Sequence, residues 1–388
     1  MAGVRYTPLE MLARLVAFDT ESAKSNLPLI DFVEDYLKGW GVPHVRVPNA
    51  EGDKAAIYAT LGPADRGGVV LSGHTDVVPV TGQSWTSDPF TLRVANGRAY
   101  GRGAVDMKGF DALALALAPD LLAMDLKTPI HILLSYDEET TCLGVMDTIA
   151  RFGLDLPPPH AVIVGEPTKL EVVDAHKSIA TFFTTVHGHE AHSSKPALGA
   201  NAVMAAAELV CELTRIADAM IARGDPSGRF APPYTTVHVG TINGGTARNI
   251  LPKSCVFHWE FRGLPDLDAG EIPNRLQRFA DEVALPRLNR HGPFGRIETE
   301  LEVFVPGLAP APGSEAEQLA LRLAGRNATA TVPFATEAGR FQGAGIATIV
   351  CGPGSIDQAH QPDEYITLED LAAGEAFMRR LAEHCTRG

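Results

Sequence analysis

The chain has 388 residues, of which 45% are apolar and 21% are charged, and its formal net charge is −14. This length and composition can supply the cores of two domains, which excludes an intrinsically disordered protein. The acidic balance argues against a nucleic-acid partner, because binding to nucleic acid requires basic surfaces.

The cysteines and the apolar stretches indicate the cellular compartment. Five cysteines are scattered without CxxC spacing, so they predict neither a disulfide framework nor a thiolate metal site, and they fit a reducing compartment. No apolar signal core follows the N-terminal residues, and no stretch approaches the roughly 18 apolar residues of a membrane span. We therefore expect a cytoplasmic protein without a membrane partner.

Strand and helix patterns alternate in the first part of the chain. Apolar residues at helical spacing predict a helix over 27–40, with Ser25 and Asn26 as candidate capping residues. Solidly apolar runs predict buried strands, and segments rich in Ala and Leu predict helices between them. Such an order predicts an α/β fold with a mostly parallel sheet and helices on both faces. The predicted strands cover 55–61, 69–71, 129–135 and 161–164, and the further helices cover 110–124 and 143–152.

The pattern changes after about residue 177 and returns to α/β character after about residue 306. Between these points the predicted elements follow the order β-α-β-β-α-β, which is that of the ferredoxin-like α+β sandwich. We therefore predict a catalytic domain made of 1–177 and 306–388, and an inserted domain over 178–305. The elements of the insert are predicted over 179–187, 201–221, 235–242, 254–262, 269–283 and 296–305, and those after it over 315–323, 346–351 and 368–384.

Residues that can bind a metal ion follow the predicted strands of the catalytic domain. Taken singly, each motif has an ordinary structural explanation, such as an acidic turn or a core histidine. In a parallel sheet, however, the carboxyl ends of the strands meet at one edge, which is where sites form. Together the motifs therefore predict two divalent metal ions that share a carboxylate, in a site that hydrolyses an amide. The segments are 72–76 (SGHTD), 101–109 (GRGAVDMKG), 136–139 (YDEE), 165–168 (GEPT) and 360–364 (HQPDE).

Two pairs within these segments indicate a division of labour. His74 and Asp76 are two residues apart on an extended segment, so their side chains point the same way and the carboxylate can orient the imidazole. Glu138 and Glu139 are adjacent like charges, which repel unless a cation lies between them or one holds a proton. One of them can bind metal while the other exchanges protons with the reacting groups.

Five motifs resemble those of one family of di-zinc amidohydrolases, namely SGHTDVVP, GRGAVDMKG, DEE, GEPT and HQPDEY. It includes acetylornithine deacetylases, succinyl-diaminopimelate desuccinylases, aminoacylases and glutamate carboxypeptidases, and the resemblance covers essentially the whole chain. It implies an amide-hydrolysing enzyme with two divalent metal ions, Zn²⁺ or alternatively Co²⁺. Carried over by position, the metal ligands would be His74 and Glu166 for one ion, Glu139 and His360 for the other, and Asp106 as the bridge.

The resemblance also assigns roles beside the ligands. Asp76 would orient His74, and Glu138 would be the general base and acid. The peptide bond between Asp106 and Met107 is usually cis in this family. The departure from the family pattern is Ala104-Val105 before the bridging aspartate, and it concerns packing more than chemistry.

The inserted domain resembles the lid and dimerisation domain of the family. His192 would stabilise the oxyanion, and Asn249 and Arg262 would bind the substrate, with the arginine suited to a free α-carboxylate. For Arg262 an intramolecular salt bridge is the alternative. A homodimer through this domain is expected.

Within the family, the match is closest to the acetylornithine deacetylase branch, on segments near the N-terminus and on 336–339 (TEAG). Glu337 is therefore a candidate for substrate contact, with a structural loop carboxylate as the alternative. The expected reaction is hydrolysis of an N-acetyl-L-amino acid, namely N²-acetyl-L-ornithine in arginine biosynthesis. Desuccinylase, aminoacylase and dipeptidase activities are the alternatives within the family, and a non-catalytic metal-binding protein is the alternative outside enzymes.

Overall fold

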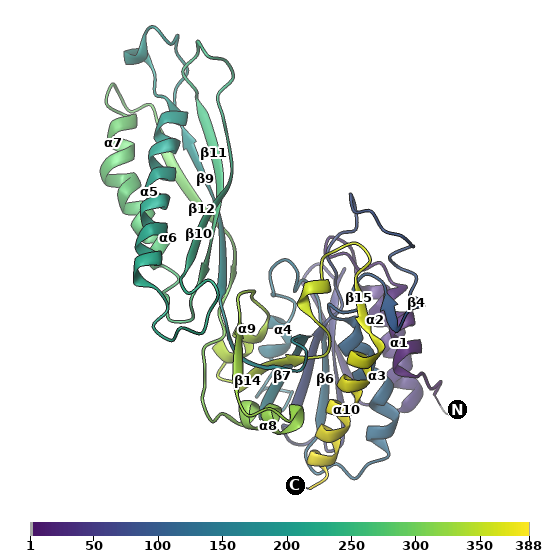
Figure 1. The fold of residues 1–388 in the computed structure, drawn as a ribbon. Helices are drawn as coiled ribbons and strands as arrows, with labels where there is room; N and C mark the ends of the chain where they lie inside the picture. Colours follow the sequence, from purple (N-terminus) through teal and green to yellow (C-terminus); the bar gives the residue numbers. More distant parts are fainter. Residues whose placement is uncertain (1–2, 388) are drawn as a thin grey trace. The chain divides into compact units, whose positions relative to one another are not determined.

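The computed structural model describes residues 3–387, which form two compact units (Figure 1). The first unit contains the described residues up to Ala175, together with Pro310–Ala330 and the residues from Thr336 onward. The second contains His176–Ala309 and Thr331–Ala335. The boundaries predicted at 177/178 and 305/306 lie a few residues from these, and the short segment 331–335 belongs with the second unit.

The first unit is built on an eight-stranded sheet with the order β1-β2-β6-β3-β7-β14-β8-β13. The four central strands β6, β3, β7 and β14 pair in parallel, whereas β1 with β2, β2 with β6, and β14 with β8 pair antiparallel. The predicted mostly parallel sheet is thus confirmed, with antiparallel pairs toward its edges. The strands are β1 (His44–Pro48), β2 (Ala55–Leu61), β3 (Val69–His74), β6 (Ile130–Ser135), β7 (Ala161–Pro167), β8 (Val172–His176), β13 (Thr329–Val332) and β14 (Thr348–Gly352).

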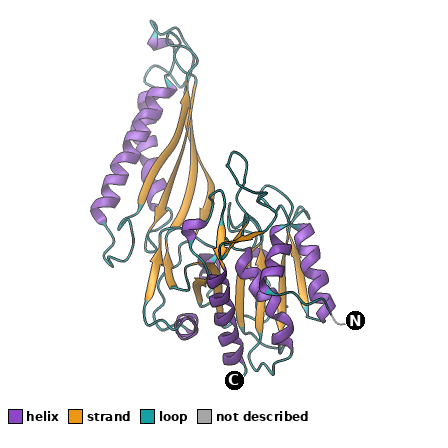
Figure 2. Cartoon of the chain, turned by 45° about the vertical axis from the view of Figure 1, so that its right-hand side comes forward, coloured by secondary structure: helices purple, strands orange, loops and turns teal. Residues whose placement is uncertain are grey.

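Helices cover both faces of this sheet, as Figure 2 shows. Gly73 of β3 lies against Asp111 of α3 (Lys108–Leu122), whereas the adjacent Ser72 bonds to Glu337 at the start of α9 (Ala338–Gly343). Because successive residues of a strand face opposite sides, α3 and α9 lie on opposite faces. The other helices are α1 (Pro8–Val16), α2 (Leu27–Trp40), α4 (Met146–Ile149), α8 (Glu315–Ala324) and α10 (Leu368–Cys385), and a small sheet contains β4 (Arg93–Ala95), β5 (Arg98–Tyr100) and β15 (Tyr365–Thr367).

One predicted helix of this unit is much shorter than expected. The sequence predicted helix over 143–152, but only Met146–Ile149 is α-helical. Left-handed backbone at Cys142, with φ of 51°, and at Gly153, with φ of 81°, bounds the segment. Such residues end helical hydrogen bonding, so the segment consists of turns on either side of one helical turn.

The second unit has an antiparallel sheet with the order β10-β11-β9-β12, and its helices cover one face (Figures 1 and 2). Buried and partly exposed residues alternate along β9 and β11, as expected for a sheet with one covered face. Phe182 stacks on Trp259 with ring centroids 4.2 Å apart in its core. The predicted β-α-β-β-α-β order is confirmed. The elements are β9 (Ser178–His187), α5 (Ala202–Arg223), β10 (Thr236–Gly244), β11 (Ser254–Gly263), α6 (Glu271–Phe279), a π-helical turn (Ala280–Ala284), α7 (Leu285–Leu288) and β12 (Arg296–Val305).

Among the described helices, none combines the length and the apolar character that crossing a lipid bilayer would require.

Candidate metal centre

The candidate metal centre lies at the carboxyl ends of three neighbouring parallel strands. His74 is the last residue of β3, Glu138 and Glu139 follow β6, and Glu166 lies near the end of β7. β3 pairs with β6 on one side and with β7 on the other, and His74 is opposite Ser135. Residues almost 100 positions apart in the sequence therefore converge because three buried strands end at the same edge.

Asp106 lies between the two predicted histidine ligands, in the loop that precedes α3. Its Oδ1 is 3.2 Å from His74 Nε2, and its Oδ2 is 3.2 Å from His360 Nε2. His360 Nε2 also lies 3.0 Å from Glu139 Oε2. Asp106 is 4% exposed, and the peptide bond to Met107 is cis. The two oxygens of one carboxylate therefore face different imidazoles, which is the geometry of a bridge.

The remaining acidic residues complete two clusters around His74. Its Nε2 lies 3.9 Å from Glu166 Oε1 and 3.8 Å from Glu138 Oε2. The ligand atoms of His74, Asp106 and Glu139 all lie within 4.8 Å of one another, and so do those of His74, Glu138 and Glu166. All five predicted ligands therefore meet in one place. Glu138 meets there too, so distance alone does not separate the predicted base from a ligand.

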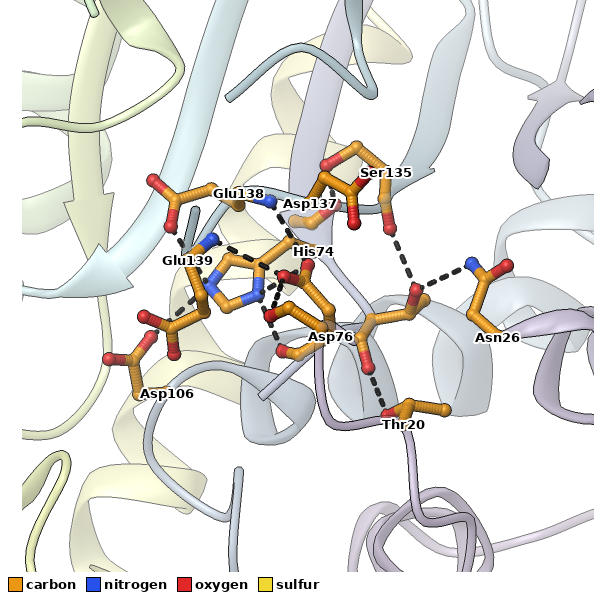
Figure 3. Close-up of polar contacts among 12 residues, drawn as sticks. Thr20, Asn26, His74, Asp76, Asp106, Ser135, Asp137, Glu138 and Glu139 are labelled. Carbon is orange, nitrogen blue, oxygen red and sulfur yellow. Dashed lines mark hydrogen bonds and ion pairs between the residues drawn. The ribbon is translucent and has the colours of Figure 1, made fainter. Parts of the chain in front are cut away.

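Asp76 holds the turn that carries the two adjacent glutamates. Its carboxylate accepts hydrogen bonds from the backbone N–H of Glu138 at 3.2 Å and of Glu139 at 3.3 Å, and from the Ser22 hydroxyl at 2.6 Å. His74 Nδ1 is 2.9 Å from the main-chain oxygen of Asp76 and 3.5 Å from its carboxylate (Figure 3). The predicted orienting role of Asp76 stays a prediction: both its main-chain oxygen and its carboxylate lie beside His74 Nδ1, and the carboxylate also holds the turn of Glu138 and Glu139.

Thr75, the residue between His74 and Asp76, is held by two side chains that the sequence did not reveal as site residues. Thr20 donates to the main-chain oxygen of Thr75 at 2.5 Å, and Asn26 donates to its hydroxyl at 2.9 Å. Asn26 was a candidate helix cap, but its side chain makes no capping bond and instead also pairs with the backbone of Ala55. No periodicity reports such contacts, because they join loops about 50 residues apart.

The site concentrates negative charge in a buried place. Burial raises the pKa of Glu138 well above its usual range, His74 opposes this shift, and Glu139 adds to it. Burial likewise raises the pKa of Glu166, and the neighbouring carboxylates of Glu138 and Asp106 raise it further. Hydrogen bonds with Asp106 and Glu139 raise the pKa of His360 to about 11. Four carboxyl groups thus share two imidazoles, an arrangement that favours additional positive charge.

The residues present fit two divalent metal ions. Glu166 Oε1 is buried and has no hydrogen-bond partner in the structure, although a buried carboxylate oxygen normally has one. A metal ion beside it would supply the missing interaction. Imidazole nitrogen and carboxylate oxygen are donors that zinc and similar divalent ions accept. His74 and Glu166 would hold one ion, His360 and Glu139 the other, and Asp106 both.

Glu337 lies beneath this site and not at its surface. It is 1% exposed, and its two carboxylate oxygens accept hydrogen bonds from Ser72 at 2.6 Å and from Ser135 at 2.8 Å. These serines belong to β3 and β6, the strands that carry His74 and lead to Glu138. The predicted substrate contact stays a prediction, and the burial of Glu337 favours its alternative, a structural carboxylate that ties two strands together.

The other predicted substrate residues belong to the second unit. His192 is exposed, and its Nδ1 accepts a hydrogen bond from the Ser194 hydroxyl at 2.7 Å. Asn249 is also exposed, and its main-chain oxygen accepts from Ser193 N–H at 3.0 Å, so its segment lies beside that of His192. Arg262 is half-buried on β11 and donates to Glu260 at 3.3 Å, which is the salt bridge named above as its alternative.

A shared aspartate between two histidine–glutamate pairs, at the strand ends of an α/β sheet, defines a metal-dependent hydrolase. Comparison with known proteins identifies the family within this class. The chain belongs to peptidase family M20/M25/M40, whose profile matches residues 70–384. The predicted family and the predicted enzyme class are thereby confirmed.

Individual relatives agree with this placement. The chain is 36% identical to the acetylornithine deacetylase of Myxococcus xanthus, over 97% of this chain and 97% of that protein. It is 34% identical to the acetylornithine deacetylase of Proteus mirabilis (strain HI4320), over 98% of this chain and 95% of that protein. Among solved structures, the M20 family metallo-carboxypeptidase Sso-CP2 from Sulfolobus solfataricus is similar with a TM-score of 0.75 and 19% identity, covering 98% and 99% of the two chains. This last likeness concerns the fold.

Proposed function

We propose that this enzyme hydrolyses the amide bond of an N-acetyl-L-amino acid, and that its substrate is N²-acetyl-L-ornithine, as in arginine biosynthesis. The observation that carries the reaction type is the position of Asp106 between His74 and His360, with Glu138 beside it. The curated relatives described above are named for the acetylornithine reaction, and this supports the choice of substrate.

The chemistry requires a proton carrier next to the attacked amide. When bound, two divalent ions supply Lewis-acid polarisation of the carbonyl and make a water acidic near neutral pH. Glu138 takes a proton from the attacking water and passes it to the leaving nitrogen, so that ornithine leaves as a neutral amine. Burial raises the pKa of Glu138, which strengthens the carboxylate as a base toward the attacking water.

Residues of the second unit complete the proposal. His192 would donate to the oxyanion that forms at the carbonyl oxygen, an interaction often worth a few kcal/mol, about 3 to 4. Arg262 would bind the α-carboxylate with its planar guanidinium, after exchanging its bond with Glu260 for the substrate, and Asn249 would assist. Zn²⁺ is the proposed metal, with Co²⁺ as the substitute.

The homodimer and the cytoplasmic location predicted from the sequence belong to the same proposal. β10 and β12 are the edge strands of the sheet in the second unit, and each exposes a large apolar side chain, Ile242 at 49% and Leu301 at 58%. Exposed strand edges of this kind are suited to pairing with a second copy.

A substrate panel tests the proposed function. Protein reconstituted with Zn²⁺ or with Co²⁺ would be assayed on N²-acetyl-L-ornithine, N-succinyl-diaminopimelate, N-acetyl-L-methionine and a dipeptide. We expect the highest kcat/KM on acetylornithine. Dominant turnover of another substrate would assign the corresponding activity within the family, and absence of turnover on all four, with metal bound, would favour a non-catalytic metal-binding protein.

A further inference from the structure

A fully buried ion pair joins Arg102 and Glu364, two residues to which no role has been assigned above. Arg102 Nη1 is 2.6 Å from Glu364 Oε2, and both side chains are 1% exposed. Neither residue is among the proposed ligands. A buried pair of this kind contributes little net stability on average, so its position near a site invites a functional explanation.

Glu364 holds the loop that carries Asp106. Its second oxygen, Oε1, accepts hydrogen bonds from the backbone N–H of Val105 at 3.0 Å and of Asp106 at 3.2 Å. Its main-chain oxygen accepts from Gly101 N–H at 2.9 Å. The carboxylate therefore fixes the main chain at the shared aspartate, while Arg102 satisfies its other oxygen.

Gln83 extends this network to His360. Its side-chain oxygen accepts from Arg102 Nη2 and, at 3.1 Å, from Trp85 Nε1. Its amide nitrogen donates to the main-chain oxygen of His360 at 2.9 Å. His360 has φ of 62°, in the left-handed region that is uncommon for residues other than glycine. A residue 277 positions away in the sequence thus holds this conformation.

The same loop holds a second left-handed position in the His360 segment. Asp363 has φ of 56°, and its Oδ1 accepts from the backbone N–H of Thr86 at 3.0 Å and from the Thr86 hydroxyl at 2.9 Å. Gln83 and Thr86, which lie in one loop, therefore hold both left-handed residues, His360 and Asp363, by hydrogen bonds.

We propose that Gln83, Arg102 and Glu364 are positioning residues that set the two ligand loops relative to each other: Glu364 acts on Asp106, Gln83 acts on His360, and Arg102 joins the two. This inference rests on the ligand assignment in the proposed function. It has a specific consequence for metal binding. Loss of the Gln83 amide should weaken only the ion held by His360 and Glu139, whereas loss of Glu364 should weaken both ions, because Asp106 is shared.

Gln83→Glu is the variant that tests this proposal most specifically. It keeps an acceptor oxygen for Arg102 but removes the amide donor and brings an oxygen against the main-chain oxygen of His360. Gln318→Glu is the matched control, because Gln318 is also a glutamine whose amide donates to a main-chain oxygen, that of Gly313 at 2.7 Å, at an exposed place. Glu364→Gln, which keeps an acceptor for the two N–H groups, and Glu364→Ala, which removes it, form the second comparison.

Calorimetric titration of the metal-stripped full chain with Zn²⁺, together with visible absorption during Co²⁺ titration, measures the two binding steps directly. In Gln83→Glu we expect one step to weaken by about 10- to 100-fold and the other to stay within about twofold, with an altered Co²⁺ spectrum for the weakened step. Gln318→Glu should match the wild type. Glu364→Ala should weaken both steps, and Glu364→Gln should be milder.

The outcomes separate the two proposals. Wild-type protein that binds fewer than two Zn²⁺ ions would contradict the proposed function before any variant is made. Wild-type protein with two steps, and Gln83→Glu with either no change or equal weakening of both, would overturn the positioning network. If Glu364→Ala does not fold, the comparison of Gln83→Glu with Gln318→Glu decides alone.

Discussion

Replacement of Glu138 by glutamine tests whether this residue is the general base or a metal ligand. The side chain is 9% exposed, its Oε2 is 3.8 Å from His74 Nε2, and its Oε1 is 3.4 Å from Cys142 Sγ, which donates to it. Glutamine has nearly the same shape and keeps an oxygen for Cys142. It cannot carry a proton between the water and the leaving nitrogen.

The size of the effect follows from the role that is removed. General acid–base catalysis by one positioned group typically contributes about 10²- to 10⁴-fold in rate. This corresponds to about 2.7 to 5.4 kcal/mol of transition-state stabilisation. Because no binding contact is assigned to Glu138, the loss should fall on kcat, and KM should change by less than about threefold.

Steady-state kinetics on acetylornithine and the metal content after dialysis, measured on the same preparation, give the two readouts. We expect two metal ions per chain in Glu138→Gln, with kcat reduced as above. Glu51→Gln, at an exposed position in the same unit, is the control and should match the wild type in both. Wild-type kcat in Glu138→Gln would refute the base assignment. A fall to one metal ion per chain would show that Glu138 is a ligand, which its distance to His74 and Glu166 permits.

Three further outcomes follow from the structure. Burial lowers the pKa of His131 from 6.5 to about 4, so the unfolded chain takes up a proton that the folded chain refuses, and the stability present above pH 6.5 is lost as the pH falls toward 4. Urea unfolding at pH 7 and pH 5 should therefore show a loss that is about 2 kcal/mol smaller in His131→Phe than in the wild type, and equal losses would contradict this. Phe257→Ala, in the core of the second unit, should lower stability by about 3 to 5 kcal/mol in calorimetry and leave metal content unchanged, since every proposed ligand lies in the first unit. Removal of metal by a chelator should abolish turnover and lower stability by about 2.7 kcal/mol for each ion lost, relative to protein in free metal at 100 times the Kd of that site, and activity that survives chelation would refute a metal-dependent reaction.

The elements that the sequence predicted well are those with strong periodicity or solid apolar runs. The buried strands β3, β6 and β7 and the helices α2, α3 and α5 fall close to their predicted positions. Weakly patterned elements were missed. β8 and β13 were not predicted, because a short strand in a mixed sheet leaves no distinctive period.

The helix expected over 143–152 shows the opposite error. Its composition suits a helix, but the chain around it must turn sharply after Glu139 and rejoin the sheet at β7. Backbone geometry at Cys142 therefore prevails over local preference. Tertiary demands of this kind are invisible to a local pattern.

For the site, the amino-acid sequence by itself determined the chemistry: which imidazoles and carboxylates follow buried strands, and hence that they meet at one edge of a parallel sheet. Only the tertiary structure decided how these groups are held. The side chain of Asp76 supports the turn of Glu138 and Glu139, Glu337 is sealed under β3 and β6, and Gln83 and Glu364 secure His360 and Asp106. The physical reason is that three of the proposed ligands, His74, Glu139 and Glu166, lie at or just after strand ends, which leave a local pattern. Their supports are hydrogen bonds between loops far apart in the chain, which do not.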